Sequence, residues 1–318
     1  MEKRPLGRSG LRVSPLCLGG NVFGWTVDED EPTSFAILDA FVASGMNFID
    51  TADVYSRWKA GNSGGESETI IGNWLKSRGN RQKVIIATKV GSDMGLGRKC
   101  LAKSYVRSAV DASLKRLQTD YIDLYQSHWD DPDTPMQETL EVYAELKKEG
   151  KVRAIGASNF SAARLEEALE VSARTGLPRY ESLQPEYNLY ERVGYETELE
   201  PLCRSNHIGV ICYYGLASGF LTGKYRSEQD FGKSARGQGM TRYLNERGHR
   251  ILQVLDEVAA EEHATPAQVA LAWLMARPGL TAPIASATNV AQLNELVGAT
   301  RLNLSSSSIE RLQRASAP

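Results

Sequence analysis

The sequence predicts a closed (β/α)8 TIM barrel, and the pattern of its apolar segments carries that prediction. Eight short apolar segments alternate with helical segments along the 318 residues, and most of the apolar segments are continuous rather than alternating. Continuous apolar runs are typical of strands buried on both faces, as in a parallel sheet covered by helices. No linker-like stretch divides the chain. We therefore expect residues 1–318 to form a single barrel domain.

The elements of this barrel can be placed in order along the chain. An N-terminal β-hairpin is predicted over residues 4–14, around Gly7-Arg8-Ser9-Gly10. The eight strands are expected at residues 16–20, 47–50, 84–89, 121–125, 152–156, 182–184, 208–212 and 282–285. Helices are expected at residues 34–44, from 65 onward, and at 103–118, 136–149, 161–173, 195–206, 247–262, 266–276 and 290–299, with an extra C-terminal helix at 305–315. A long irregular stretch, rich in Gly and charge, covers about 215–245.

The competing architecture is a doubly wound open sheet with a second domain. That fold normally carries a G-x-G-x-x-G dinucleotide fingerprint directly after its first strand. Here the corresponding place holds Leu18-Gly19-Gly20-Asn21-Val22-Phe23-Gly24, which does not match. The barrel is therefore the preferred fold.

Charge and composition exclude several classes of partner. Lys and Arg number 37 against 39 Asp and Glu, a formal charge of -2 that gives no general attraction to nucleic acid or to an anionic membrane. No apolar run approaches the roughly 18 residues of a membrane span, and the N-terminus has no apolar signal core. The four widely spaced cysteines form no metal-binding motif and read as core residues of a reducing compartment. We expect a cytoplasmic protein without disulfide or zinc.

Polar residues at the ends of the predicted strands are the candidate site residues. In a barrel of this kind the carboxyl ends of the strands converge on one mouth. The residues at or just past those ends are Asp50, Lys89, His128, Ser158, Asn159, Gln184 and Tyr213. Asp50, Lys89 and His128 follow one another at intervals of 39 residues, one strand-helix unit apart. This regular recurrence favours a common site.

Each of these residues also has a purely structural interpretation. Asp50 could cap a turn, Tyr55 could be an ordinary half-buried ring, and a lone histidine such as His128 is more often structural than catalytic. Lys89, however, ends a buried strand, where an ammonium group needs a carboxylate partner, and Asp50 supplies one. Taken together, the four residues describe an acid site in which Lys89 lowers the pKa of the Tyr55 phenol and His128 orients the group that Tyr55 protonates.

Six motifs, in order over nearly the whole chain, resemble those of the aldo-keto reductase superfamily, most closely its bacterial branch. They are Phe48-Ile49-Asp50-Thr51-Ala52-Asp53-Val54-Tyr55, Ala87-Thr88-Lys89, Gln126-Ser127-His128, Gly156-Ala157-Ser158-Asn159-Phe160, Gln184-Pro185-Glu186-Tyr187-Asn188 and Ser218-Gly219-Phe220-Leu221-Thr222-Gly223-Lys224-Tyr225. The resemblance implies a barrel that binds NAD(P)H across its mouth without a metal. It also implies that Tyr55 is the general acid, that Lys89 is paired with Asp50, and that His128 orients the carbonyl.

The resemblance also implies which residues bind the cofactor. Ser158, Asn159 and Gln184 match positions that hydrogen-bond the nicotinamide carboxamide, and Tyr213 matches the ring that stacks on the nicotinamide. The pyrophosphate would lie along residues 216–224, which include Leu216, Ser218, Gly219, Leu221 and Lys224. The adenine end would be bound by Ser286, Thr288, Asn289, Gln292 and Glu295.

Two departures from the family pattern bear on the cofactor. Where relatives often read Tyr-Ser-Pro-Leu, this chain reads Tyr213-Tyr214-Gly215-Leu216, which alters the turn after the stacking ring. Many relatives place a Lys near the position of Ser286 and an Arg near that of Gln292 to bind the 2′-phosphate, and this chain has neither charge. Neutral donors discriminate less strongly than arginine does. NADPH is the expected cofactor, and NADH remains possible.

The substrate and the partners are less closely specified by the sequence. Phe23, Trp25, Trp58 and Trp129 lie in loops expected to ring the mouth as an aromatic wall, although some could merely pack the loops. The implied substrate is a small aldehyde, ketone, alcohol or sugar lactol. A nucleotide-sensing subunit of a membrane channel and a non-redox barrel enzyme are the alternatives. Homo-oligomer formation stays open.

Overall fold

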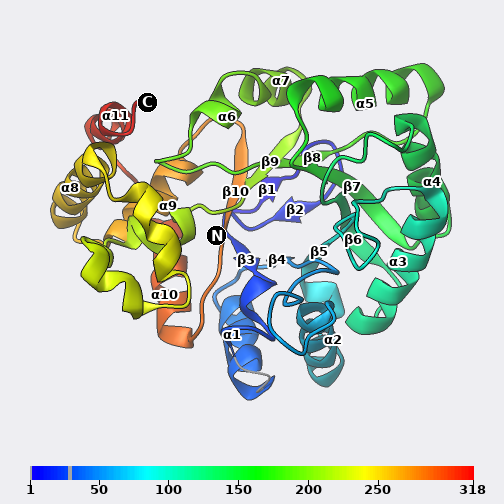
Figure 1. Cartoon of the computed structure of the whole chain (residues 1–318), viewed down its shortest axis with the longest axis horizontal. Helices are drawn as coiled ribbons and strands as arrows, with labels where there is room; N and C mark the ends of the chain where they lie inside the picture. Colours follow the sequence, from blue (N-terminus) through cyan, green and yellow to red (C-terminus); the bar gives the residue numbers. More distant parts are fainter. Residues whose placement is uncertain (1, 28–30) are drawn as a thin grey trace.

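Eight parallel strands close into a barrel that is surrounded by helices in the computed structural model, which describes residues 2–27 and 31–318 (Figure 1). Around the barrel the strands follow the order β10-β3-β4-β5-β6-β7-β8-β9. They are β3 (Cys17–Gly19), β4 (Phe48–Asp50), β5 (Ile85–Val90), β6 (Ile122–Ser127), β7 (Val152–Ser158), β8 (Ser182–Gln184), β9 (Gly209–Cys212) and β10 (Leu280–Ala285). The predicted (β/α)8 barrel is confirmed.

The apolar strand residues are divided between two hydrophobic clusters because each strand is covered on both faces. The larger cluster packs the outer face of the barrel against the helices. The smaller one fills the barrel interior and includes Leu6, Leu11 and Val13, which flank the short hairpin strands β1 (Arg4–Pro5) and β2 (Arg12–Val13) or belong to them. The predicted hairpin therefore exists, and its side chains close one end of the barrel. The carboxyl ends of the strands open at the other end.

The helices follow the predicted order with small shifts at their ends. They are α1 (Glu31–Ala43), α2 (Glu66–Arg78), α3 (Lys103–Leu117), α4 (Met136–Lys148), α5 (Ala162–Thr175), α6 (Val193–Glu196), α7 (Leu199–Ser205), α8 (Glu246–Glu261), α9 (Pro266–Met275), α10 (Val290–Gly298) and α11 (Ser306–Ala315). Capping interactions fix the first residue of several helices. At α9, for example, Thr265 and Gln268 form a capping box and Pro266 occupies the first turn. The extra helix α11 packs against α8 at the side of the barrel (Figure 1).

One helix prediction was wrong. The segment 195–206 was expected to form one helix, but the chain forms α6 and then, after a break, α7. Pro201 has no backbone N–H to donate to the preceding turn, so it is compatible with the first turn of α7 but not with a helix continuing from α6.

The irregular stretch after β9 contains three short 3-10 helices, Ala217–Thr222, Glu228–Lys233 and Gly237–Tyr243. Its first turn is tight, since Tyr214, Ala217 and Ser218 all have positive φ angles between 47° and 57°. Stacking of Phe220 on Tyr243, with ring centroids 5.0 Å apart, ties its first and last parts together. Among the described residues, no helix combines the length and the apolar character that a membrane span requires. All four cysteines are buried.

Candidate active site

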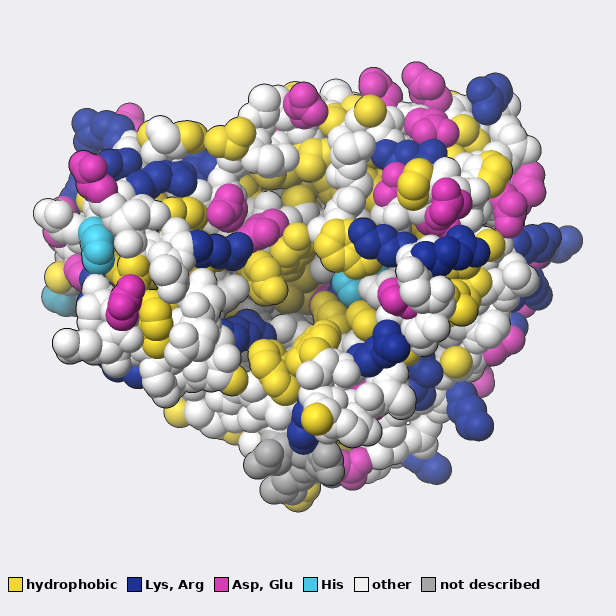
Figure 2. Space-filling model, in the orientation of Figure 1, with side chains coloured by type: hydrophobic (Ala, Val, Ile, Leu, Met, Phe, Trp, Pro, Cys, Tyr) yellow, Lys and Arg dark blue, Asp and Glu magenta, His cyan; other side chains and the backbone are white. Residues whose placement is uncertain are grey.

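A cavity of about 1300 Å³ opens at the carboxyl ends of the strands. Figure 2 shows this hollow, with apolar side chains and a histidine at its floor and basic residues along parts of its rim. Most of the predicted site residues line it: Asp50, Tyr55, His128, Ser158, Asn159, Gln184, Tyr213, Leu216, Ser218, Gly219, Lys224, Ser286, Thr288, Gln292, Glu295, Trp25, Trp58 and Trp129. Residues more than 200 positions apart in the sequence thus face one space.

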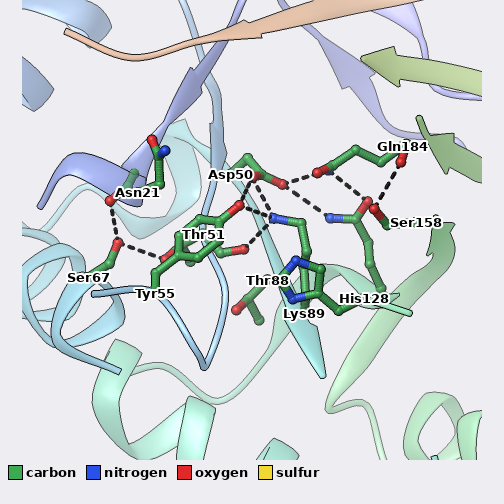
Figure 3. A network of polar contacts seen from close by, with 12 residues as sticks. Asn21, Asp50, Thr51, Tyr55, Ser67, Thr88, Lys89, His128, Ser158 and Gln184 are labelled. Atoms are coloured by element: carbon green, nitrogen blue, oxygen red, sulfur yellow. Dashed lines mark hydrogen bonds and ion pairs between the residues drawn. The ribbon is translucent and has the colours of Figure 1, made fainter. Parts of the chain in front are cut away.

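Lys89 and Asp50 form a buried ion pair at the cavity floor, where Asp50 lines the cavity and Lys89 lies beneath it. Lys89 Nζ lies 2.6 Å from Asp50 Oδ2 and donates a second hydrogen bond of 2.9 Å to the carbonyl oxygen of Thr51 (Figure 3). Both side chains are almost fully buried, at 0% and 1% exposure. An unpaired ammonium or carboxylate would be costly here, so each group requires the other.

The second oxygen of Asp50 is held by two amides. Gln184 Nε2 donates to Asp50 Oδ1 at 2.9 Å, and Gln126 Nε2 donates to the same oxygen at 3.2 Å. Gln184 was predicted to hydrogen-bond the nicotinamide, but its NH2 group is committed to Asp50 and to Gln126 Oε1, 3.2 Å away. Sequence reasoning assigned Gln126 no role. Its position on β6, paired in register with Lys89 on β5, was the available signal.

The Tyr55 hydroxyl lies between the cavity and this ion pair. Lys89 Nζ is 2.8 Å from Tyr55 Oη, and the phenol donates to Asp50 Oδ2 at 3.3 Å. Burial, followed by the charge of Asp50 and the hydrogen bond to it, raises the pKa of Tyr55 well above its ordinary value of 10.0. The expected lowering by Lys89 was therefore wrong, because burial and then the charge of Asp50 outweigh the effect of the Lys89 ammonium group. The phenol is protonated at neutral pH, the form that a general acid requires.

His128 faces the same space and is neutral. Burial, with smaller contributions from Lys89 and Lys99, lowers the pKa of His128 well below 6.5. Its Nδ1 lies 2.9 Å from the hydroxyl oxygen of Ser92, and its ring lies 6.1 Å from the Tyr55 ring, centroid to centroid. Ser92 was not predicted, although it follows the strand of Lys89 by only two residues. A neutral imidazole whose Nδ1 accepts from Ser92 carries its proton on Nε2.

The residues predicted to hold the nicotinamide form one hydrogen-bonded set. Asn159 donates from Nδ2 to the carbonyl oxygen of His128 at 3.0 Å and to Ser158 Oγ at 3.1 Å, and Tyr213 donates its hydroxyl to Asn159 Oδ1 at 2.8 Å. Ser158 Oγ donates to the carbonyl oxygen of Gln184 at 2.9 Å. Asn159 has a φ angle of 56°, a left-handed conformation that asparagine tolerates better than most residues. These contacts fix the Tyr213 ring beside the cavity.

The rest of the cavity lining combines neutral donors near the start of α10 with the cations Lys224 and Arg236, of which Arg236 lies beside the tryptophans near Tyr55. Thr288 donates to Gln292 Oε1 from both its backbone N and its hydroxyl, at 2.9 and 3.0 Å, near the start of α10. Lys224 and Arg236 line the cavity, and neither forms an ion pair with a carboxylate in the part of the chain that the structure describes. The Arg236 guanidinium lies 5.2 Å from the ring centroid of Trp25. The positive charges thus come from residues 224–236 rather than from the start of α10.

Four predicted site residues do not line the cavity. Lys89 is buried beneath its floor, as described above. Phe23 and Leu221 are 0% exposed and belong to the hydrophobic core between barrel and helices. Asn289 caps α10, where its side chain accepts a hydrogen bond from the backbone N–H of Gln292. Phe23 is therefore a packing residue and not part of the aromatic wall, because its side chain lies in the core while Trp25 of the same loop lines the cavity.

The aromatic wall consists of three tryptophans close to Tyr55 and His128. Trp58 lies 5.6 Å from Trp25 and 5.9 Å from Tyr55, each in an edge-on arrangement, and Trp129 stacks near His128 at 6.1 Å. Trp58 is 49% exposed although it is a large apolar ring. Exposed apolar side chains around a polar site are typical of a surface that binds a ligand.

Comparison with known proteins agrees with this arrangement. Residues 15–317 match the model of the aldo/keto reductase family. The "Uncharacterized oxidoreductase YrpG" of Bacillus subtilis is 38% identical over 96% of this chain and 92% of its own length. "Aldo-keto reductase YhdN" of the same organism is 34% identical over 96% and 91%, respectively. A "Probable voltage-gated potassium channel subunit beta" of Arabidopsis thaliana is 34% identical over 93% and 90%. The chain therefore belongs to the aldo/keto reductase family, which supports oxidoreductase activity on carbonyl compounds and whose reductases generally use nicotinamide cofactors.

Proposed function

We propose that the protein is an NADPH-preferring reductase of aldehydes and ketones, acting reversibly as an alcohol dehydrogenase, with Tyr55 as the general acid. The observation that carries this proposal is the contact of the Tyr55 hydroxyl with the Lys89–Asp50 ion pair at the floor of the cavity, 2.8 Å from Lys89 Nζ. A phenol in that position can deliver a proton to a substrate oxygen and leave a phenolate next to an ammonium.

The cavity fits an extended nicotinamide dinucleotide. Its volume exceeds the range of a typical drug-sized site, and it joins Tyr213 at one end to Ser286 and Glu295 at the other. The unpaired cations Lys224 and Arg236 are suited to phosphate groups. When bound, the cofactor supplies the hydride. The fixed ring of Tyr213 would support one face of the nicotinamide, and Ser158 and Asn159 would hold its carboxamide.

The residues around Tyr55 then have separate roles toward the substrate oxygen. His128, neutral and with its proton on Nε2, donates a hydrogen bond that orients the carbonyl. The Tyr55 hydroxyl transfers its proton to the oxygen as negative charge develops there. Lys89 stabilises the resulting phenolate, and Asp50 keeps Lys89 in place. The tryptophans of the wall exclude water from the reacting atoms and receive the apolar part of the substrate.

The preference for NADPH is supported by the charges that remain in the cavity. Ser286 and Gln292 are neutral where many relatives place cations, but Arg236 and Lys224 provide positive charge from another segment. A 2′-phosphate adds a doubly charged group, so unpaired cations favour NADPH over NADH. We further propose that the protein acts on small molecules in the cytoplasm and not on nucleic acid.

The proposal is tested by following NADPH absorbance with a panel of aromatic aldehydes. The wild type should turn over, and Tyr55→Phe should lose about 10²- to 10⁴-fold in kcat while it still quenches tryptophan fluorescence on NADPH binding. Unchanged turnover in Tyr55→Phe would show that another group donates the proton. Absence of NADPH binding in the wild type would favour a non-redox barrel enzyme.

The alternative is a subunit that binds the nucleotide mainly to report redox state. The observation in its favour is the 34% identity to the protein named as a potassium channel subunit. This alternative predicts tight NADPH binding, very slow turnover with every aldehyde, and stable co-purification with a membrane partner. Turnover at ordinary enzymatic rates would exclude it.

A further inference from the structure

Asp53 is a buried carboxyl group that the proposed reaction does not use. Its side chain is 3% exposed and does not line the cavity, and its Oδ1 has no hydrogen-bond partner among the described residues. It nevertheless lies next to the chemistry, two residues before Tyr55. Its backbone N–H donates to the carbonyl oxygen of Lys89 at 3.3 Å. Any displacement of Asp53 therefore acts on the segment that places Tyr55 against Lys89.

The charges around Asp53 are unbalanced. Three carboxyl groups, those of Asp50, Asp53 and Glu68, are buried on this side of the barrel with exposures of 3% or less. Two cations accompany them: Lys89 pairs with Asp50 at 2.6 Å, and Arg116 Nε pairs with Glu68 Oε2 at 2.6 Å. In the part of the chain that the structure describes, Asp53 forms no ion pair, so a third carboxylate near Glu68 would be buried without a cation of its own, which is costly. A proton on Asp53 removes that cost.

Arg116 is held beside Glu68 by an ion pair and by close packing. Helices α2 and α3 approach so closely that a Cβ on Gly72 would lie 2.1 Å from the carbonyl oxygen of Arg116. The Arg116 side chain runs over Gly65, where a Cβ would lie 2.5 Å from its Cδ and Nε atoms. Its Nη2 also donates to Ser113 Oγ at 3.2 Å. The guanidinium is therefore committed to Glu68.

We propose that Asp53 is a positioning residue that, as a neutral carboxylic acid, holds the segment from Thr51 to Tyr55 against Lys89, so that loss of its proton displaces the general acid. This inference rests on the proposed function. Ionisation of Asp53 would set two like charges in the interior. The segment that carries Asp53 is bonded on both sides, from the Thr51 hydroxyl to Ser67 of α2 at 2.8 Å and from the Asp53 N–H to the carbonyl oxygen of Lys89, so this repulsion strains the contacts that place Tyr55. The Tyr55 hydroxyl would then lose its geometry relative to Lys89.

The titration behaviour of the neighbouring groups supports this assignment. Burial and then the charge of Glu68 raise the pKa of Asp53 from 3.8 to about 8, against smaller opposing effects of Arg116, the Val54 backbone N–H and Lys89. The hydroxyls of Tyr105 on α3, Tyr125 on β6 and Tyr143 on α4 also face this region, and burial raises the pKa of each. These phenols are uncharged at pH 8. The pKa of Tyr55 is raised and the pKa of His128 is lowered, so both move away from pH 8.

The test compares the pH dependence of kcat in the wild type, Asp53→Asn and Asp53→Ala with NADPH and an aromatic aldehyde. Asparagine has the shape of the neutral acid but cannot ionise. In the wild type, kcat should fall about tenfold from its plateau by pH 9, one unit above a pKa of about 8. Asp53→Asn should lack that decline and keep most of the neutral-pH activity, whereas Asp53→Ala should be slower at every pH. The KM for NADPH should be unchanged.

A second measurement needs no turnover. The infrared difference spectrum between the wild type and Asp53→Asn should contain the carbonyl stretch of a protonated carboxylic acid at pH 6.5, and this band should fall to about a tenth of its intensity by pH 9. The near-ultraviolet circular dichroism of the Tyr55–Trp58 ring pair should change over the same pH range in the wild type only. An alkaline decline that persists in Asp53→Asn, or absence of the infrared band, overturns the inference. If no aldehyde is reduced, the proposed function fails separately, and the two spectra still decide whether Asp53 is neutral and moves Tyr55.

Discussion

The charge state of Asp53 predicts a specific pH dependence of the stability of the protein. In the folded state the pKa of Asp53 is raised from 3.8 to about 8, chiefly by burial. Between these two pH values the folded state therefore binds a proton that the unfolded state has released. Stability falls with rising pH wherever the folded state binds more protons, so this group lowers the free energy of unfolding progressively from about pH 4 to pH 8. The contribution is constant above that range.

The magnitude follows from the size of the shift. Each pKa unit corresponds to about 1.4 kcal/mol, so full ionisation of Asp53 costs on the order of 5 to 6 kcal/mol. Part of this cost already applies at pH 5, which leaves about 3 to 4 kcal/mol of lost stability between pH 5 and pH 8. Asp53→Asn cannot ionise and should lack this loss. Relative to the wild type, the variant should therefore gain about 3 to 4 kcal/mol over that pH interval.

The assay is equilibrium unfolding in urea at several pH values from 5 to 8, monitored by tryptophan fluorescence. Because the two proteins are compared at the same pH, the contributions of the histidines and other shared groups to the pH dependence of stability cancel. Asp120→Asn is a matched control, because it removes the same charge from an exposed position just after the end of α3. A pH-dependent difference that is larger in Asp53→Asn than in this control is the effect of the buried site. A wild-type-minus-Asp53→Asn difference that stays constant from pH 5 to pH 8 would refute the charge assignment.

Two further substitutions test other parts of the site. Lys89→Met leaves the buried Asp50 carboxylate without a cation, so it should lower the free energy of unfolding at pH 7 by about 3 to 5 kcal/mol in the same urea assay and abolish measurable aldehyde reduction. Arg236→Ala removes an unpaired cation from the cavity, so it should raise the Kd of NADPH, measured by fluorescence titration, by about tenfold and that of NADH much less. An equal effect on both nucleotides would place Arg236 away from the 2′-phosphate.

The barrel itself could be predicted because its signal is local and repeated. Each strand is a continuous apolar run, and each helix is separated from the next strand by a short loop, so eight repeats mark the architecture. The exception, the division of 195–206 into α6 and α7, arose where Pro201 interrupts an otherwise helical pattern. Such a break could have been foreseen from the same residue.

The floor of the site was also accessible to sequence reasoning, because strand ends in a barrel converge. Asp50 and Lys89 lie at the ends of neighbouring strands, and their opposite charges require pairing in a buried place. The pKa of Tyr55 was not accessible in the same way. The direction of its shift depends on how deeply the phenol is buried and on the balance of Asp50 against Lys89, and neither the burial nor the distances of 3.3 and 2.8 Å can be read from a sequence pattern.

Loops were the least predictable part, because their side chains have no periodic pattern. Phe23 and Trp25 are two residues apart in one loop, yet Phe23 is buried in the core and Trp25 faces the cavity. The same limit applies to Arg236, whose side chain reaches Trp25 from a segment more than 200 residues away. Only the folded chain places these residues on the same wall.

Asp50 and Asp53 show why two carboxylates in one turn can differ so strongly. Asp50 ends a strand and meets Lys89 from the neighbouring strand, a pairing that follows from barrel topology. Asp53 faces Glu68 and Arg116, whose relative positions depend on the close approach of α2 and α3 at Gly72. The close approach of these helices pairs the Arg116 cation with the Glu68 carboxylate, and Asp53 takes no part in that ion pair. The proton that Asp53 retains is thus a consequence first of burial and then of the charge of Glu68, and its proposed effect reaches the general acid through two residues of backbone.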